Sequence, residues 1–190
     1  MKIVAIEESF NNSVCVCYPD SSLLRNNDDF YIPNFSSHIQ ATIGVYISIH
    51  KIGKHIDTQF IHRYYKSYGL AINFVATDVI QQLHNKHLST DMARGFDHSF
   101  AVSTHVFSKD SHPFEKAHFE CTYNTMHFES KGAQIIDKIH AICAECSQYY
   151  TLKIGDIVFL PLWNIPGKIN IGDLFNASIN TQYVLHCSVK

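Results

Sequence analysis

Charged side chains are scarce in this sequence, and none of its apolar runs is long. Only 17% of the 190 residues are Asp, Glu, Lys or Arg, and the formal net charge is -2. The sequence therefore lacks both the basic stretch that indicates nucleic-acid binding and an acidic tail. Its longest apolar runs, such as residues 157–163, fall well short of the roughly 20 residues that cross a bilayer. We expect neither a nucleic-acid nor a membrane partner.

The sequence also lacks an export signal, because Glu7 and Glu8 interrupt its first apolar residues too early for a signal peptide. We therefore expect a cytoplasmic protein, in which the six cysteines stay free thiols and form no structural disulfide. A chain of this length with 46% hydrophobic residues can bury roughly 70% of its unfolded surface. We predict one domain over residues 1–190, with N-terminal strands and a loop at 1–30 and the core at 31–190.

Two alternating stretches lie in the middle of the chain. Residues 43, 45, 47 and 49 are apolar and share one face, whereas Thr42 and Gly44 lie on the other, as a half-buried strand requires. A second strand is predicted over residues 70–77, where the odd-numbered residues, Asn73 among them, point one way. Between these strands, Asp57 is predicted to open an amphipathic helix that ends at Gly69.

Other patterns predict strands at residues 2–6 and 13–18, a hairpin over 116–129, a helix over about 133–149 and a strand in the last ten residues. Cys143 and Cys146 lie on the apolar stripe of that helix, away from its N-terminus, which favours core residues over a redox pair. Cys15 and Cys17 share a face of their strand. They are either packed residues, which we favour, or a metal or vicinal redox pair.

Four segments of the sequence resemble the fumarylacetoacetate hydrolase family, in particular its short bacterial members. These segments are FYIPNFSSHIQATIGVYISIHKIGKHI, YYKSYGLAINFVATDV, ARGFDHSF and YYTLKIGDIVFLPLWNIPGKINIGDLF. The resemblance implies an α+β fold that is mainly β, a mixed β-sandwich roll with short flanking helices, and a homodimer. It also implies metal-assisted C–C bond cleavage, decarboxylation or isomerisation of small dioxo acids, with Mg²⁺ or Mn²⁺ as the cofactor.

The same resemblance places the metal site at Thr42, Gly44 and Asn73. Family members are similar in carrying Glu-x-Glu on the first strand and Asp-x-x-x-Arg-Asp on the second, and the three leading carboxylates hold the ion. None of the three matching residues here is a carboxylate. Mg²⁺ demands hard oxygen donors in near-octahedral geometry. We therefore predict a degenerate metal site and no metal cofactor.

The family's other functional motifs are altered too. Its Arg-Asn-Tyr segment corresponds to residues 7–12, its Lys-Pro to Tyr18 and Pro19, and its Gln-x-Gly-Asn-Thr to residues 129–134. Where the family has a Gly-Thr-Pro-x-Gly loop, residues 161–163 bring apolar bulk, which is expected to narrow or fill the pocket. Arg94 stands in place of a lysine that reaches the substrate's carboxylate or oxyanion, and arginine can pair a planar anion bidentately. The alternative interpretation of Arg94 is a solvated surface residue without a role in binding.

Asp78 matches a family aspartate, but the arginine beside it is replaced by Thr77. Followed by Gln81 three residues later, Asp78 fits a capping box, and we favour capping over catalysis. The candidate catalytic residues of a divergent enzyme are Arg94, Asp97, His98 and Asp78, and the candidate ligand contacts are Arg94, Asn73 and Thr42. Among thirteen histidines, His38 and His98 could join Asp97 around a transition metal, although scattered, solvated histidines are the favoured interpretation.

These observations predict a family member that has lost the metal-dependent reaction, a pseudoenzyme. It would bind a small anionic ligand without catalysis or pair with an active relative. The alternative is a divergent hydrolase or lyase that acts on a small 2-oxo or dioxo acid.

Overall fold

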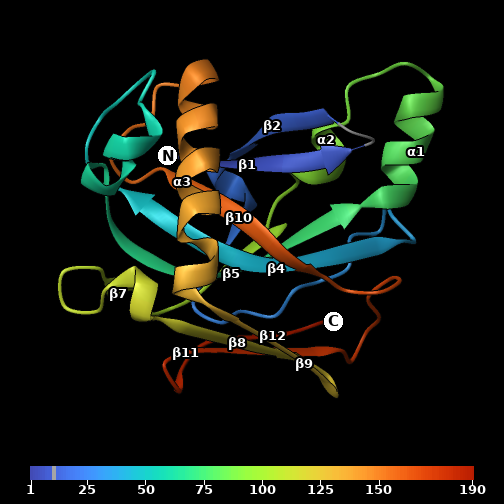
Figure 1. Cartoon of the computed structure of the whole chain (residues 1–190). Coiled ribbons are helices and arrows are strands. Elements are labelled where there is room, and N and C mark those ends of the chain that lie inside the picture. Colours follow the sequence, from blue (N-terminus) through green and yellow to red (C-terminus); the bar gives the residue numbers. More distant parts are fainter. Residues whose placement is uncertain (10–11) are drawn as a thin grey trace.

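Two β-sheets and a few helices make up the fold (Figure 1). The computed structural model describes residues 1–9 and 12–190, without the side chains of residues 7–9, 12 and 13. The interpretation of residues 7–12 as an altered family motif thus lies outside what it describes. The eight-stranded sheet has the order β2-β1-β10-β4-β5-β6-β3, with β7 added beside β5. In chain order its strands are β1 (Lys2–Ser9), β2 (Asn12–Pro19), β3 (Leu23–Leu24), β4 (Ile39–Ile49), β5 (Tyr65–Ala76), β6 (Phe100–Val102), β7 (Phe107–Ser108) and β10 (Ile157–Asn164).

The second sheet has four strands in the order β12-β11-β8-β9 and is antiparallel throughout. Its strands are β8 (His118–Tyr123), β9 (Met126–Lys131), β11 (Leu174–Ile179) and β12 (Gln182–Ser188). In the large sheet, β1 with β10 and β3 with β6 are parallel pairs among antiparallel ones. The predicted fold class, a mixed β-sandwich roll with short flanking helices, is therefore confirmed.

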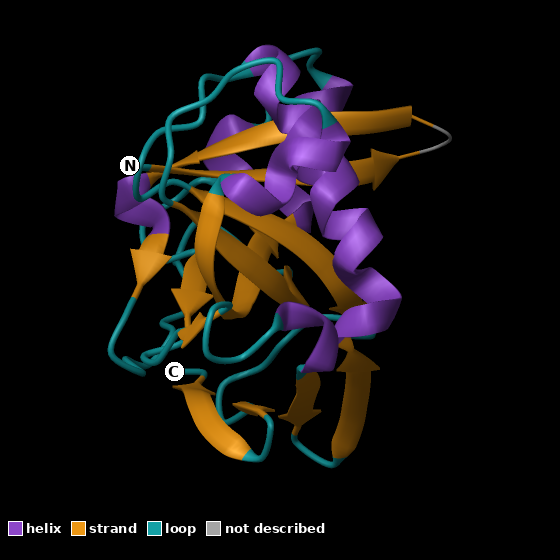
Figure 2. Cartoon of the chain, turned by 60° about the vertical axis from the view of Figure 1, so that its left-hand side comes forward, coloured by secondary structure: helices purple, strands orange, loops and turns teal. Residues whose placement is uncertain are grey.

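The helices pack on the outside of the sheets. They are α1 (Thr77–Asn85), α2 (Asp91–Arg94), α3 (Gly132–Tyr149) and the 3-10 turns η1 (Asp20–Ser22), η2 (Thr58–Arg63) and η3 (Phe114–Lys116). The predicted helix near residue 133 is confirmed as α3, which leaves β9 and runs along the large sheet (Figures 1 and 2). No helix in the described part of the chain is long and apolar enough to cross a bilayer.

The alternation of β4 and β5 divides the core into two clusters. Ile43, Val45 and Ile47 of β4 join the large cluster, which the two sheets and α3 enclose. The opposite faces of the strands hold a smaller cluster that contains Tyr18, Tyr46 and Phe159. The predicted faces of β4 are therefore confirmed, and Thr42 and Gly44 lie on the side of the smaller cluster.

The predicted helix from Asp57 to Gly69 is wrong. Only η2 forms, and its N-cap Asp57 accepts a hydrogen bond from the backbone of Gln59. From Tyr65 the chain is already in β5, where Tyr65 pairs with Ile49 and Gly69 pairs with Tyr46. The long pairing of β5 with β4 provides backbone hydrogen bonds and buries Tyr65 and Tyr68. Tertiary pairing therefore overrides the local helical periodicity.

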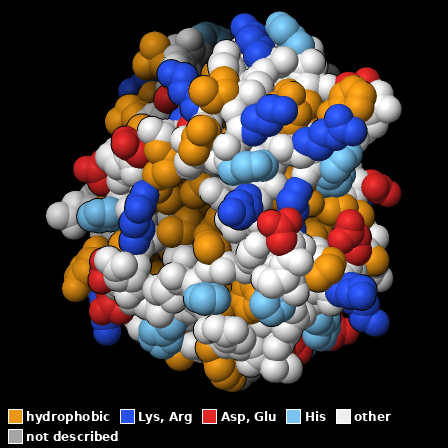
Figure 3. All heavy atoms as spheres, turned by 90° about the vertical axis from the view of Figure 1, so that its left-hand side faces the viewer, with side chains coloured by type: hydrophobic (Ala, Val, Ile, Leu, Met, Phe, Trp, Pro, Cys, Tyr) orange, Lys and Arg blue, Asp and Glu red, His pale blue; other side chains and the backbone are white. Residues whose placement is uncertain are grey.

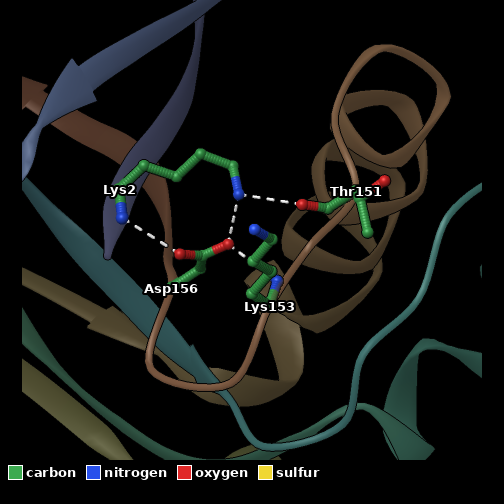
Figure 4. A network of polar contacts seen from close by, with 4 residues as sticks. All are labelled: Lys2, Thr151, Lys153 and Asp156. Carbon is green, nitrogen blue, oxygen red and sulfur yellow. Dashed lines mark hydrogen bonds and ion pairs between the residues drawn. The ribbon is translucent and has the colours of Figure 1, made fainter.

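A buried ion pair fastens the start of β1 to the start of β10 (Figure 4). The carboxylate of Asp156, only 1% exposed, accepts hydrogen bonds from the Lys2 ammonium group, from the Lys2 backbone at 3.0 Å and from the Lys153 backbone at 2.7 Å. The Lys2 ammonium also donates to the Thr151 carbonyl at 2.8 Å. These contacts hold together two strands that begin 155 residues apart in the chain.

Candidate functional site

The main cavity of the protein opens where β1 and β10 separate. Their pairing ends at Ala5 and Phe159, and the residues that follow on both strands line a cavity of about 840 Å³. The β1–β2 hairpin forms one wall, β4 and β5 form the floor, and α1 and α3 close the sides. Of the sequence-predicted site residues, Thr42 and Asn73 line this cavity.

A row of polar residues crosses the floor of the cavity. Asn164 of β10, Thr42 of β4 and Asn73 of β5 are directly opposite one another in the sheet. The Thr42 hydroxyl donates a hydrogen bond of 2.8 Å to the side-chain oxygen of Asn164. This bond uses the one proton that the Thr42 hydroxyl can donate. Toward a ligand, the Thr42 oxygen can therefore only accept a hydrogen bond.

Asn73 is held from the opposite wall by Tyr18 of β2. Its side-chain nitrogen donates a hydrogen bond of 3.0 Å to the Tyr18 hydroxyl. Asn73 is 6% exposed, and its side-chain oxygen is buried without a hydrogen-bond partner among the described residues. A buried polar atom without a partner costs about 1–3 kcal/mol, so such an atom at a cavity indicates a place where a ligand or a water can bind.

Gly44 follows Thr42 by two residues on β4 but does not line the cavity, because the backbone of β10 covers it. A Cβ atom at Gly44 would lie 2.1 Å from the carbonyl oxygen of Leu160 and 2.7 Å from the ring of Phe159. No carbon atom fits at such distances unless the strand moves. Gly44, which the family resemblance places at a metal-ligand position, thus has no room here for any side chain.

Among the described side chains, the charged ones that line the cavity are Lys138 and Glu145, and both come from α3. Lys138 and Glu145 are seven residues apart, so they lie two turns apart on one face of the helix. Neither residue could be identified from the sequence, because the periodicity of a helix does not indicate which of its charged residues face a cavity. Tyr18 was also missed as a polar site residue. Its only signal was that it replaces the lysine of the family's Lys-Pro.

The apolar residues 161–163 are divided between two environments. Pro161 and Leu162 line the cavity, as expected for residues that narrow it. Trp163 is not among the lining residues, and its ring lies 6.0 Å from that of Phe128 on β9, measured between the centroids. The tryptophan therefore packs between the sheets, and the cavity stays open.

The remaining candidates lie outside the cavity lining. Arg94 ends α2, where its guanidinium donates a hydrogen bond to the Thr90 hydroxyl. Asp97 and His98 are exposed in the loop that follows. None of these three residues lines the cavity, so their roles in binding or catalysis remain predictions.

Asp78 ties the loop before β4 to α1. Its carboxylate accepts hydrogen bonds from the Ser36 hydroxyl at 2.6 Å, from the Ser37 backbone at 2.8 Å and from the Ser37 hydroxyl at 3.0 Å. It also accepts one from the Val79 backbone at 2.9 Å. The predicted capping box is wrong, because Ala76 is the N-cap and Asp78 lies inside the helix. Partial burial raises the pKa of Asp78, but these hydrogen bonds outweigh it and lower the pKa to about 2.

We predict that Asp78→Ala lowers the free energy of unfolding by about 1–2 kcal/mol at pH 7, because it removes hydrogen bonds to a charged acceptor. The pKa of Asp78 is lower in the folded protein than its ordinary value of 3.8, so its contribution is fully present above pH 3.8 and declines as the pH falls toward 2. Urea unfolding at pH 7 and at pH 3 measures both effects. A difference between variant and parent that is equally large at both pH values would contradict this role.

The histidines do not gather around the cavity. Among the side chains that the structure describes, one group of at least three metal-binding residues lies close together: His118, Glu120 and Glu129, whose ligand atoms all lie within 4.8 Å of one another. This group belongs to β8 and β9, and none of its members lines the main cavity. His38, Asp97 and His98 are not brought together as such a group.

The fold and its cavity together define the class of this protein. It is a mixed β-roll with a cavity in its curled sheet, next to the point where the pairing of β1 and β10 ends. Solved structures share this fold. Fumarylpyruvate hydrolase from Pseudomonas aeruginosa, in complex with Mn²⁺ and pyruvate, matches with a TM-score of 0.84 at 14% identity, over 100% of this chain and 89% of that one.

Two isomerases are similar as well. 5-Carboxymethyl-2-hydroxymuconate delta-isomerase from Mycobacterium smegmatis has a TM-score of 0.79 at 15% identity, over 99% of this chain and 78% of that one. 2-Hydroxyhepta-2,4-diene-1,7-dioate isomerase from Mycobacterium marinum has a TM-score of 0.80 at 18% identity, over 99% and 73%. At these identities the likeness establishes the fold only.

The sequence itself establishes the family. The sequence model of the fumarylacetoacetate (FAA) hydrolase C-terminal domain matches residues 3–189. The chain therefore belongs to the fumarylacetoacetate hydrolase family. A sequence comparison with curated proteins finds no match.

Proposed function

We propose that this protein uses the cavity to bind a small ligand without a divalent metal ion, either as a non-catalytic binder or as the partner subunit of an active relative. The observation that supports this proposal most strongly is the floor of the cavity. None of Thr42, Gly44 and Asn73 is a carboxylate, and the backbone of β10 leaves no room for a side chain at Gly44. Backbone packing and side-chain chemistry thus both support a cavity floor that holds no ion.

The donors present do not fit Mg²⁺ or Mn²⁺. Such hard ions are bound by several oxygen ligands, usually with carboxylates among them. Here Thr42 offers a neutral hydroxyl that already bonds Asn164, and Asn73 offers one neutral amide oxygen. The one carboxylate among the described lining residues is Glu145, which comes from α3 rather than from the floor.

The cavity suits a small carboxylate that also bears a hydroxyl or primary amide group. Such a group both donates and accepts, so it can pair with the free end of the Asn73 amide whichever way that amide is turned. Lys138 supplies a positive charge for the ligand's carboxylate. In this proposal Arg94 is replaced by Lys138 as the principal anion contact, because Arg94 is not part of the lining.

A titration with Mn²⁺, followed by calorimetry, tests the proposal. We expect no site tighter than about millimolar in the cavity, because the floor has no anionic ligand. The surface group on β8 and β9 is a second place where a cation could bind, so the titration is repeated with His118→Ala. Micromolar binding at one site per chain that persists in His118→Ala but is lost in Asn73→Leu would place a metal in the cavity and refute the proposal.

A divergent hydrolase or lyase acting on a small 2-oxo or dioxo acid is the second candidate. It is favoured by the shared fold with a fumarylpyruvate hydrolase whose structure contains Mn²⁺ and pyruvate, and by a cavity that remains large enough for such an acid. Turnover of acylpyruvates and oxaloacetate distinguishes the two candidates. Activity that disappears in Arg94→Ala would support the enzyme and would give Arg94 the role predicted from the sequence.

The expected partners and location belong to this proposal as well. We propose a cytoplasmic homodimer, on the basis of the family resemblance, and sedimentation analysis of the purified chain measures the subunit number. Basic, acidic and histidine side chains are mixed across the face shown in Figure 3. This mixture supports a partner other than nucleic acid, which requires a continuous basic surface.

A further inference from the structure

Two cysteines that are distant in the sequence meet where β2 packs on α3. The sulfur of Cys15 lies 3.0 Å from the sulfur of Cys146. This separation is only about 1 Å longer than a disulfide bond. Cys15 is half-buried, whereas Cys146 is fully buried in the large core cluster.

We propose that Cys15 and Cys146 form a redox modification site, at which a small-molecule disulfide such as oxidised glutathione converts the two thiols reversibly into a disulfide bond. The sequence patterns C-x-C and C-x-x-C did not indicate this pair, because each pattern pairs cysteines within one element. The contact instead takes one cysteine from each pattern and exists only in the folded chain.

Cys15 is the thiol that reacts first. It is the more exposed of the two sulfurs, so an oxidant in solution can reach it. The hydrogen bond between the two side chains lowers the pKa of Cys15, which favours the thiolate that attacks a disulfide. Cys17 is exposed on the same strand, but partial burial of its sulfur raises its pKa. Cys143 is buried and its pKa is raised to about 12, so it is inert at neutral pH.

The exchange proceeds in two balanced steps. The Cys15 thiolate attacks one sulfur of oxidised glutathione, which forms a mixed disulfide and releases one glutathione thiolate. Cys146 then loses its proton to that released thiolate, or to water, and attacks the Cys15 sulfur, which expels the second glutathione. Overall the two cysteines lose two electrons and two protons, and the oxidant becomes two glutathione thiols.

The bond would join two walls of the cavity. Tyr18, which holds Asn73, lies three residues after Cys15 on β2, and Glu145 precedes Cys146 on α3. Oxidation therefore adds a covalent link between these two walls. The inference does not depend on the proposed ligand, because the sulfur contact exists whatever the cavity binds.

The test equilibrates the purified chain in glutathione buffers of increasing oxidised fraction, traps free thiols by alkylation and measures intact mass and linked peptides. We expect a loss of two hydrogens, a peptide pair joined through Cys15 and Cys146, and full recovery of both thiols after dithiothreitol. Cys15→Ser and Cys146→Ser are each expected to abolish this bond. Cys17→Ser is the matched control, since it removes a more exposed thiol two residues away and leaves the bond unchanged.

Other results would overturn the inference. They are a bond that uses Cys17 or Cys143, a disulfide between two chains, a mixed glutathione adduct that never resolves, or no bond in the most oxidising buffer. A disulfide bond that forms only in urea would also refute the inference, because the two cysteines would then react in the unfolded chain and not in the folded one. Far-ultraviolet circular dichroism of the serine variants confirms that they are folded.

Discussion

Replacing Asp156 with alanine is expected to lower the free energy of unfolding by about 3 kcal/mol, because it breaks a buried ion pair from one side. The carboxylate is 1% exposed and accepts from the Lys2 ammonium and from two backbone N–H groups (Figure 4). Without it, the Lys2 ammonium keeps only the Thr151 carbonyl. The backbone N–H groups of Lys2 and Lys153 also lose their acceptor.

Urea unfolding of parent and variant at neutral pH measures this loss. Asp57→Ala is the matched control, since Asp57 is an exposed aspartate whose side chain accepts one backbone hydrogen bond at the start of η2. It is expected to cost about 1 kcal/mol, as caps usually do. If the two variants lost the same stability, the junction of β1 and β10 would not be the anchor described above. Asp156→Asn, which keeps an acceptor in place, is expected to fall between them.

Alternation was a reliable guide to the strands and helical spacing predicted α3, but helical spacing misled between residues 57 and 69. The faces of β4 could be predicted because every second residue between 41 and 49 is apolar, and that pattern has one structural solution. The tyrosines between residues 64 and 68 also have a helical spacing. However, they precede a segment that extends the ladder with β4, and this pairing could not be read from the segment itself.

The cavity floor could be located from the sequence, but its walls could not. Thr42, Gly44 and Asn73 were predicted to share a site through the family resemblance, and Thr42 and Asn73 do line one cavity. Lys138 comes from a helix that the resemblance did not place at the cavity, and Tyr18 and Asn164 were not identified as polar residues of the site. Their contributions depend on long-range packing, such as the bond from Asn73 to Tyr18, 55 residues apart.

The backbone of β10 closes over Gly44, so the proposed absence of a metal ion does not rest on missing carboxylates alone. In β10 the register with β4 shifts between Pro161 and Trp163, next to the place where Leu160 and Phe159 crowd Gly44. A glutamate restored at position 44 would therefore have to displace a strand before it could reach an ion. Restoring carboxylates at positions 42 and 73 alone would leave the ligand set incomplete.

We therefore expect Gly44→Ala to destabilise the protein by about 3 kcal/mol, at the upper end of the usual cost of overpacking, because the added carbon meets a backbone oxygen at 2.1 Å. Thermal and urea unfolding measure the loss. Gly69→Ala is the matched control on the neighbouring strand, where the three nearest atoms belong to the side chains of Ser103 and Tyr46 and can move aside. Its loss is expected to be clearly smaller. If Gly44→Ala were as stable as the parent, β10 would be free to move away from β4, and the floor could again accept a side chain there.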